Sequence, residues 1–328
     1  MLNIFKFINY SITLLIMTSS MAQAMQAPKT LKQKIVLNPD FTMDIAYTIE
    51  NEHMENTLLF IHGNSASKEF FSNLSTELLP DFRLIKVDLP GHGESDDFSM
   101  TMQEQYELNN DMVFEHYDNF YTFAGYARVM NQFIDKLSIN KDKLSILGWS
   151  LGGHIAIHMA KTSHMHKVVL TGTPVQSFAD MKGAFSFLKT LLVNNANFPE
   201  NTSITDLLSF NKHFSAEQAV IFHAAGGFIT QDGAIAQKAG MRTNPIARSA
   251  MIHFCSNAAD KLELEHMDQK AIVLSKKDTF KIIQGSQDPI KSPNNLGLDI
   301  SEIEGAAHAV FHTHPKEYAD ALLKSLRM

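Results

Sequence analysis

The chain has 328 residues, of which 45% are hydrophobic and 19% are charged, and its formal net charge is −7. This composition is typical of a globular protein, and the length suffices for one large α/β domain or two smaller ones. The acidic balance and the lack of a long basic run argue against a nucleic-acid partner. We find no internal repeat and no low-complexity tract.

The first 24 residues have the pattern of a secretory signal peptide. Lys6 precedes a mostly apolar stretch at 7–17, and Ala22-Gln23-Ala24 follows as a small-x-small cleavage motif. The apolar stretch is short for a membrane span. We therefore expect a cleaved signal at 1–24, export to a bacterial periplasm or to the medium, and no stable membrane insertion afterwards. A retained membrane anchor or a buried N-terminal helix is the alternative.

Short apolar runs predict the strands of a sheet. They lie at 34–37 and 43–49, which form an opening hairpin, and at 57–61, 84–87, 144–147, 168–170, 280–283 and 298–300. Continuously apolar runs indicate a sheet buried on both faces. Helical patterns occur at 68–79, 123–137 and 315–326. This alternation predicts an α/β fold with a doubly wound, mostly parallel sheet.

The segment at 174–267 carries helix signals and no clear strand. We interpret it as a helical lid inserted between two strands of the core, with a separately folding domain as the alternative. The expected organisation is thus a signal at 1–24, a first part of the core at 25–173, the lid at 174–267 and a second part of the core at 268–328.

The stretch Gly148-Trp149-Ser150-Leu151-Gly152 lies between an apolar run and a helical pattern. A serine hydroxyl is a weak nucleophile until a base removes its proton. A sharp strand-to-helix turn lifts the serine clear of the sheet, and the two glycines remove side chains that would clash. The N-terminus of the helix offers free N–H groups to a developing negative charge. The pattern indicates Ser150 as a nucleophile, and a turn required only for packing is the alternative.

Five segments in this order make the chain resemble the α/β-hydrolase family, in its lidded branch that acts on small molecules. They are His62-Gly63-Asn64, the run from Asp88 to Ser95, the serine turn, the run from Gly285 to Pro289, and the run from Gly305 to His308. The resemblance covers residues 57–328 apart from the lid, and it implies the α/β-hydrolase fold. Within these segments, Asp88 belongs to a motif that resembles a structural turn.

The resemblance implies a catalytic triad in the chain order of this family. Ser150 is the nucleophile, Asp288 is the acid at the end of a strand, and His308 is the general base on a later loop. Two alternatives stay open. Asp180 lies beyond another strand, where some members carry the acid, and the base could be His312 or His314, which we otherwise expect at the surface.

The resemblance also implies an oxyanion hole made of two backbone N–H groups, from Asn64 and Leu151. Trp149 flanks the nucleophile and His62 belongs to a turn motif of the family, so both are candidates to line the substrate pocket. For Trp149, core packing is equally plausible.

No metal or cofactor is expected. His154 and His158 have a spacing typical of metal ligands, but Ile155 stands where the zinc-protease motif has a glutamate, so that interpretation fails. No nucleotide or flavin fingerprint is present.

Serine in the turn argues against the dehalogenases and epoxide hydrolases of this family, which carry an aspartate there. We expect an enzyme that hydrolyses carboxylic esters of small or medium apolar acyl substrates through an acyl-enzyme. Apolar residues of the lid suit an acyl group if they face the site. A lactonase, a proline iminopeptidase-like amide hydrolase and a non-catalytic binding protein of this fold are the alternatives. The sequence does not indicate the oligomeric state.

Overall fold

A computed structural model describes residues 28–38, 41–76, 78–97, 121–176, 233–244, 247–248 and 268–327. The chain divides into two units between Thr30 and Leu31, and the fold given below is that of the second unit. The expected signal segment and most of the expected lid lie outside the described residues, so their boundaries stay predictions. None of the helices in the described ranges has the length and apolar character that a membrane span requires.

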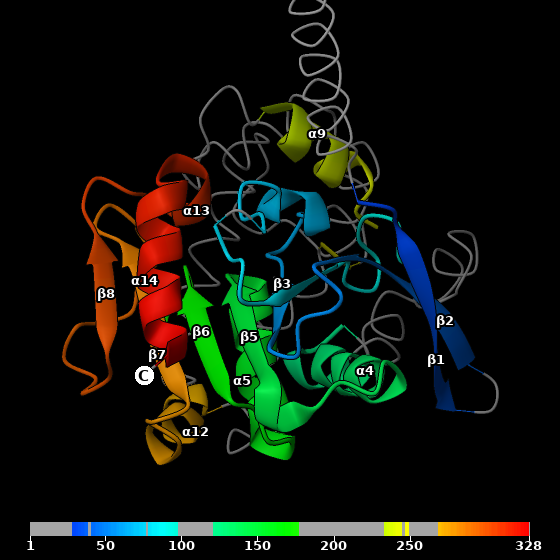
Figure 1. The fold of residues 1–328 in the computed structure, drawn as a ribbon, viewed down its shortest axis with the longest axis horizontal. Coiled ribbons are helices and arrows are strands. Elements are labelled where there is room, and N and C mark those ends of the chain that lie inside the picture. Colours follow the sequence, from blue (N-terminus) through cyan, green and yellow to red (C-terminus); the bar gives the residue numbers. More distant parts are fainter. Residues whose placement is uncertain are drawn as a thin grey trace, which may run out of the picture. The chain divides into compact units, whose positions relative to one another are not determined.

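An eight-stranded sheet forms the centre of this unit (Figure 1). The strands are β1 (Leu31–Asn38), β2 (Phe41–Glu50), β3 (Thr57–Ile61), β4 (Arg83–Val87), β5 (Leu144–Trp149), β6 (Lys167–Thr171), β7 (Phe280–Gly285) and β8 (Ile300–Ile303). Their spatial order is β1-β2-β4-β3-β5-β6-β7-β8. Strand β2 is antiparallel to both of its neighbours, and all other pairs are parallel. The predicted hairpin and mostly parallel sheet are confirmed.

The strand order reverses direction at β3, which has β4 on one side and β5 on the other. Ile61 at the end of β3 lies opposite Gly148 near the end of β5. In an open parallel sheet, such a reversal leaves a crevice beyond the carboxyl ends of the strands, and ligands bind there. The topology therefore predicts a ligand-binding site at the loops that follow β3 and β5.

Helices cover both faces of the sheet (Figure 1). They are η1 (Lys68–Phe71), α4 (Phe123–Lys136), η2 (Lys141–Lys143), α5 (Leu151–Thr162), α9 (Gly233–Met241), α12 (Gln269–Ser275), α13 (Val310–Thr313) and α14 (Pro315–Arg327). Apolar residues of α4, α5 and α12 join the core on one face, and those of η1, α13 and α14 join the core on the other.

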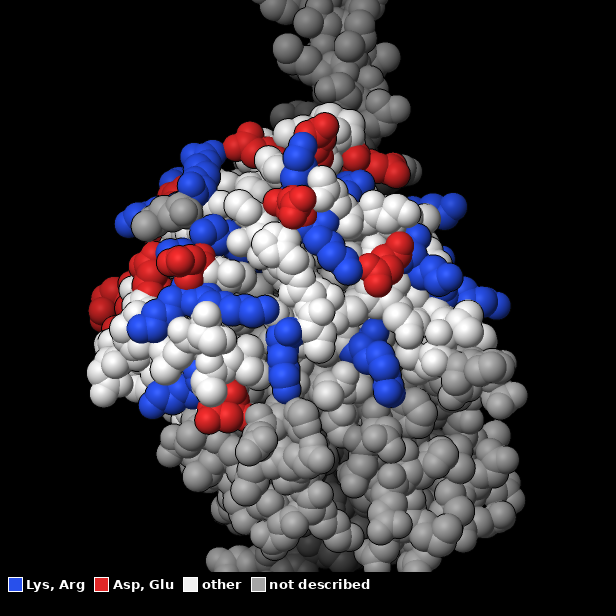
Figure 2. Space-filling view, turned by 90° about the horizontal axis from the view of Figure 1, so that it is seen from below, with Lys and Arg blue, Asp and Glu red and all other residues white. Residues whose placement is uncertain are grey.

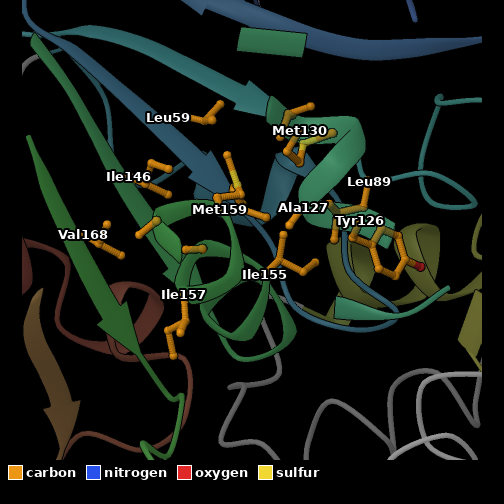
Figure 3. Close-up of a cluster of buried hydrophobic side chains, with 14 of the residues drawn as sticks. Leu59, Leu89, Tyr126, Ala127, Met130, Ile146, Ile155, Ile157, Met159 and Val168 are labelled. Atoms are coloured by element: carbon orange, nitrogen blue, oxygen red, sulfur yellow. The ribbon is translucent and has the colours of Figure 1, made fainter. Parts of the chain in front are cut away.

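Alternation along the strands divides the core between these two faces. Figure 3 shows Leu59 and Ile146 directed toward Met130 of α4 and Met159 of α5. The next residue of β3, Phe60, belongs to the opposite cluster. Burying one such side chain stabilises the fold by about 1.5–3 kcal/mol. The sheet is thus buried on both faces, as the continuously apolar strands predict.

The helix predicted at 68–79 is wrong in its extent. Among the described residues of this range, only Lys68–Phe71 is helical, as the 3₁₀ segment η1, and turns follow it. The Leu74 N–H donates to Phe71 O at 3.0 Å, which is an i to i+3 bond. Ser72 and Ser75 disfavour a longer helix because their hydroxyls compete for backbone groups. Strand β8 also begins at Ile300, two residues later than predicted.

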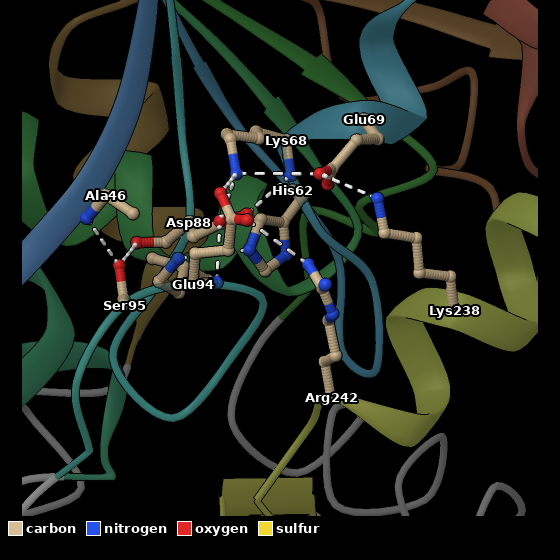
Figure 4. Close-up of polar contacts among 10 residues, drawn as sticks. Ala46, His62, Lys68, Glu69, Asp88, Glu94, Ser95, Lys238 and Arg242 are labelled. Atoms are coloured by element: carbon tan, nitrogen blue, oxygen red, sulfur yellow. Dashed lines mark hydrogen bonds and ion pairs between the residues drawn. The ribbon is translucent and has the colours of Figure 1, made fainter. Parts of the chain in front are cut away.

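The turn after β4 is fixed by buried charged groups (Figure 4). The fully buried carboxylate of Asp88 accepts hydrogen bonds from Lys68 Nζ and from the Lys68 N–H, both at 2.7 Å. Lys68 Nζ also lies 2.9 Å from the Glu94 carboxylate. Ser95 Oγ donates to Asp88 O and accepts from the Ala46 N–H, which ties the turn to β2. Asp88 therefore has the structural role that its motif predicts.

On the face seen in Figure 2, Lys and Arg side chains are interspersed with Asp and Glu side chains. Ion pairs between exposed side chains, such as Lys316 with Asp320 at 2.8 Å, contribute little to stability. The charged groups that matter for the fold are therefore the buried ones.

Candidate active site

Ser150 occupies a strained turn between β5 and α5. Its φ is 54° and its ψ is −117°, a conformation that non-glycine residues adopt only where their surroundings enforce it. The Ser150 N–H donates to Thr171 O at 2.8 Å, and Ser150 O accepts from Thr173 Oγ1 at 3.0 Å. These bonds to β6 and to the loop after it engage the backbone of Ser150 and hold the turn.

Glycines permit the close contacts around this turn. A Cβ atom on Gly152 would lie 2.0 Å from Ile61 O, and one on Gly148 would lie 2.5 Å from Gly152 O. A Cβ atom on Gly63 would lie 3.1 Å from Ser150 Cβ. The start of α5 therefore rests on the backbone at the end of β3. This is the steric reason for the two glycines that the sequence indicates.

Asp288 and His308 lie within hydrogen-bond distance at the same edge of the sheet. His308 Nδ1 is 3.1 Å from Asp288 Oδ2 and 3.2 Å from Oδ1, and both residues are buried. The loops that carry them touch, since a Cβ atom on Gly285 would lie 2.1 Å from Ala306 O. The Ile290 N–H donates to Asp288 Oδ1 at 3.0 Å. The imidazole of His308 and the Ile290 N–H thus both hold the Asp288 carboxylate.

His308 is anchored beside the strand ends that flank Ser150. Trp149 Nε1 donates to His308 O at 3.1 Å. Gly172 has φ 56°, and a Cβ atom there would lie 2.7 Å from His308 Nδ1. In the part of the chain that the structure describes, no hydrogen bond joins the Ser150 hydroxyl to the His308 ring. The structure therefore brings Asp288 and His308 together as a carboxylate–imidazole pair, and the assignment of Ser150 to the same triad stays a prediction.

His62 and Trp149, the pocket candidates, make structural contacts. His62 is fully buried, its Nε2 accepts from the Leu89 N–H at 3.0 Å, and its Nδ1 donates to Gly63 O at 2.7 Å. Trp149 is buried and stacks on Phe70 with ring centroids 5.5 Å apart. Both side chains position the backbone beside Ser150, and core packing accounts for the contacts of Trp149.

The two N–H groups predicted for the oxyanion hole lie on segments adjacent to Ser150. Leu151 is the first residue of α5, where an N–H has no partner within the helix. Asn64 follows Gly63, and its Nδ2 donates to Arg248 O at 3.3 Å. No pattern in the sequence marks Arg248, because its contacts with this loop are remote in the chain. Gly172 was not predicted to lie against His308, although a glycine directly after an apolar strand is a signal for a close contact.

Among the other candidate histidines, His154, His158 and His312 are buried, whereas His314 is half-buried. His154 Nδ1 lies 2.6 Å from Gln269 Oε1, and its ring stacks on Phe123. His312 is buried on α13, with its ring edge-on to Phe70, so the expectation of a surface residue is wrong. Within the described ranges, no group of three or more His, Cys, Asp or Glu residues could hold a metal ion. The alternative acid, Asp180, lies outside the described residues.

Comparisons with known proteins bear on the family and the fold of the chain. A family model described as "Alpha/beta hydrolase family" matches residues 58–321. A 2-hydroxy-6-oxononadienedioate/2-hydroxy-6-oxononatrienedioate hydrolase of Pseudomonas putida is 29% identical over 155 residues, which are 45% of this chain and 47% of that protein. The chain spans about half the length of this curated relative, and less of the others that it matches.

Two solved structures show the same fold. A variant of an N-acyl homoserine lactonase in complex with N-hexanoyl homoserine is 23% identical, with a TM-score of 0.59 over 91% of this chain and 97% of that chain. A malate-bound thermophilic esterase from Thermogutta terrifontis is 15% identical, with a TM-score of 0.64 over 90% of this chain and 98% of that chain. The fold expected from the sequence is thereby confirmed.

Buried histidines make the stability of this fold depend on pH. Burial lowers the pKa of His62 and of His154 from 6.5 to about 4, and it lowers the pKa of His92 well below its ordinary value. The unfolded chain takes up these protons near pH 6.5, whereas the folded chain resists them down to about pH 4. The free energy of unfolding therefore falls as the pH drops through this window.

The substitution His154→Gln keeps a donor for Gln269 and removes the titrating ring. We expect it to reduce the difference in unfolding free energy between about pH 7 and about pH 4.5 by about 2 kcal/mol, measured by urea unfolding. The control His164→Gln changes an imidazole that is 66% exposed, and it should leave this difference unchanged. An unaltered pH dependence in His154→Gln would contradict a neutral His154.

Proposed function

The chain belongs to the alpha/beta hydrolase family, and on this premise we propose that it is a serine hydrolase for carboxylic esters of small or medium apolar acyl substrates. The proposal assigns Ser150 as nucleophile, His308 as general base and Asp288 as the group that orients the imidazole. One observation supports it most. The strained Ser150 turn lies at the edge of the sheet where Asp288 and His308 meet at 3.1 Å.

The proposed mechanism follows from the contacts of His308. Because Nδ1 faces the Asp288 carboxylate, Nε2 is the nitrogen that accepts the proton of Ser150. Ser150 Oγ then bonds to the ester carbonyl carbon, and the carbonyl oxygen becomes an oxyanion that accepts from the Leu151 and Asn64 N–H groups. The C–O bond to the alcohol breaks, and the alcohol leaves with the proton from His308. Water repeats the steps on the acyl-enzyme and releases the acid.

A lactone is a cyclic ester, so the same steps would open it and leave the hydroxyl on the released acid. The similarity to an N-acyl homoserine lactonase, which extends over 97% of that chain, favours this second candidate. An amide hydrolase of the proline iminopeptidase kind and a non-catalytic binding protein are the remaining alternatives.

A substrate panel with a serine variant tests the proposal. The panel contains p-nitrophenyl esters of increasing chain length, an N-acyl homoserine lactone and a proline arylamide. We expect turnover of one class, and we expect Ser150→Ala to lower it by at least about 10³-fold because the nucleophile is lost. The control Ser163→Ala, at the other end of α5, should keep wild-type activity. Activity retained in Ser150→Ala would disprove the assignment, and no turnover of any substrate would favour a binding protein.

The acid is tested by Asp288→Asn, which leaves a side chain of the same shape. Because the imidazole loses its orienting charge and its correct tautomer, we expect kcat to fall by about 10⁴-fold. Asp278→Asn is the control, since the backbone oxygen of Asp278, and not its carboxylate, accepts from Lys167. A loss of this size in Asp180→Asn instead would identify Asp180 as the acid.

We also propose that residues 1–24 are a signal that is removed on export. The apolar stretch at 7–17 and the Ala22-Gln23-Ala24 motif support this. The mass of the protein recovered from the periplasm or the medium should correspond to a chain that begins near Met25. A mass that includes residues 1–24 would favour a retained anchor.

A further inference from the structure

We propose that Arg248 is a positioning residue that holds the loop after β3, residues 62–65, in the place required for the oxyanion hole. The inference rests on the proposed function, because this loop carries Asn64. Arg248 lies in the segment that follows α9 and comes from a part of the sequence remote from both β3 and Ser150.

Arg248 contacts the loop at two consecutive residues. Its Nε donates to Ser65 Oγ at 2.9 Å, and its backbone oxygen accepts from Asn64 Nδ2 at 3.3 Å. Its NH2 group donates to Gly240 O at the end of α9. The residue is 1% exposed. One buried side chain therefore links α9 to the loop that would supply an oxyanion donor.

The same loop touches the nucleophile on its other side. A Cβ atom on Gly63 would lie only 3.1 Å from Ser150 Cβ, so a small displacement of the loop changes the space beside Ser150. Ser65 has φ 58° and is fully buried. A serine in this conformation persists only when its surroundings hold it, and the bond from Arg248 Nε is one of the contacts that do so.

Burying an arginine at this position costs free energy unless its N–H donors find hydrogen-bond partners. Burial lowers the pKa of the guanidinium to about 9, so the group remains a cation at neutral pH. Burying a cation carries a large desolvation penalty, whereas an apolar side chain of similar size would carry none. The directional donors to Ser65 and Gly240 are what an apolar side chain could not provide.

Other contacts hold the segment of Arg248 against the core. The Asn244 N–H donates to Gly91 O at 2.7 Å, and Asn244 Nδ2 donates to Asp97 Oδ2 at 2.6 Å. Arg242 NH1 lies 3.4 Å from the Glu94 carboxylate, and Figure 4 shows this pair. Because these contacts are independent of the guanidinium of Arg248, a variant at Arg248 can lose the bond to Ser65 while the segment stays docked.

The test uses Arg248→Met, which keeps the length of the side chain and removes its donors, together with Ser65→Ala and the double variant. The substrate is the member of the panel that the wild type hydrolyses fastest. The inhibitor is phenylboronic acid, because its adduct with the serine is a tetrahedral anion that resembles the proposed intermediate.

We expect kcat to fall by about 10- to 100-fold with little change in KM, since an imperfectly placed oxyanion donor affects the transition state more than the bound substrate. The inhibition constant should rise by a similar factor.

The double variant should be no slower than the slower single variant, because both substitutions remove the same bond. Arg248→Lys should recover part of kcat, and the control Arg327→Met, which changes a side chain that is 66% exposed at the end of α14, should keep wild-type kinetics. Two results would overturn the inference: a normal kcat in Arg248→Met with only the melting temperature lowered, or a normal kcat in Ser65→Ala. If Arg248→Met does not fold, Ser65→Ala alone decides. Activity retained in Ser150→Ala is a separate result that would overturn the proposed function.

Discussion

The backbone of helix α5 touches the backbone of strand β3, and the candidate site depends on this contact. Gly152 lies so close to Ile61 O that no side chain fits between them. The helix can begin there only if the chain turns sharply after β5, and the strained φ of 54° at Ser150 is the result. The start of α5 is thus placed where the strand order reverses, which is the edge of the sheet where a parallel α/β fold binds its ligands.

Similar backbone contacts bring distant parts of the chain to this edge. Gly285 rests against Ala306 O, which joins the loops of Asp288 and His308, and Gly172 rests against the His308 ring. The first contact is between main-chain atoms, and in the second the glycine leaves room for the imidazole ring. Close contacts of this kind leave little room for the loops to shift, and a fixed geometry is what the proposed catalysis by oriented groups requires.

Local patterns in the sequence predicted the parts of the fold that depend on local forces. Strand β3 has the predicted bounds, 57–61, because its four consecutive apolar residues, Leu58 to Ile61, must be buried on both faces. The expected helix at 68–79 is reduced to the short 3₁₀ segment that ends at Phe71, because the turn-forming serines that follow outweigh its apolar spacing. The role of Arg248 was not predictable, since its contact with Ser65 spans 183 residues and no local motif marks it.

The segment from His62 to Phe71 contains the loop after β3 and the helix η1. Buried polar groups hold this segment at three points. His62 accepts from the Leu89 N–H, Ser65 accepts from Arg248, and the Lys68 N–H donates to Asp88. Buried charged groups add little net stability, since their desolvation offsets much of their attraction, but their directional bonds can select one conformation over its neighbours. A loop held in this way by the turn after β4 and by the segment after α9 has its backbone N–H groups fixed in direction. For the Asn64 N–H, that direction decides whether it can donate to an oxyanion formed at Ser150.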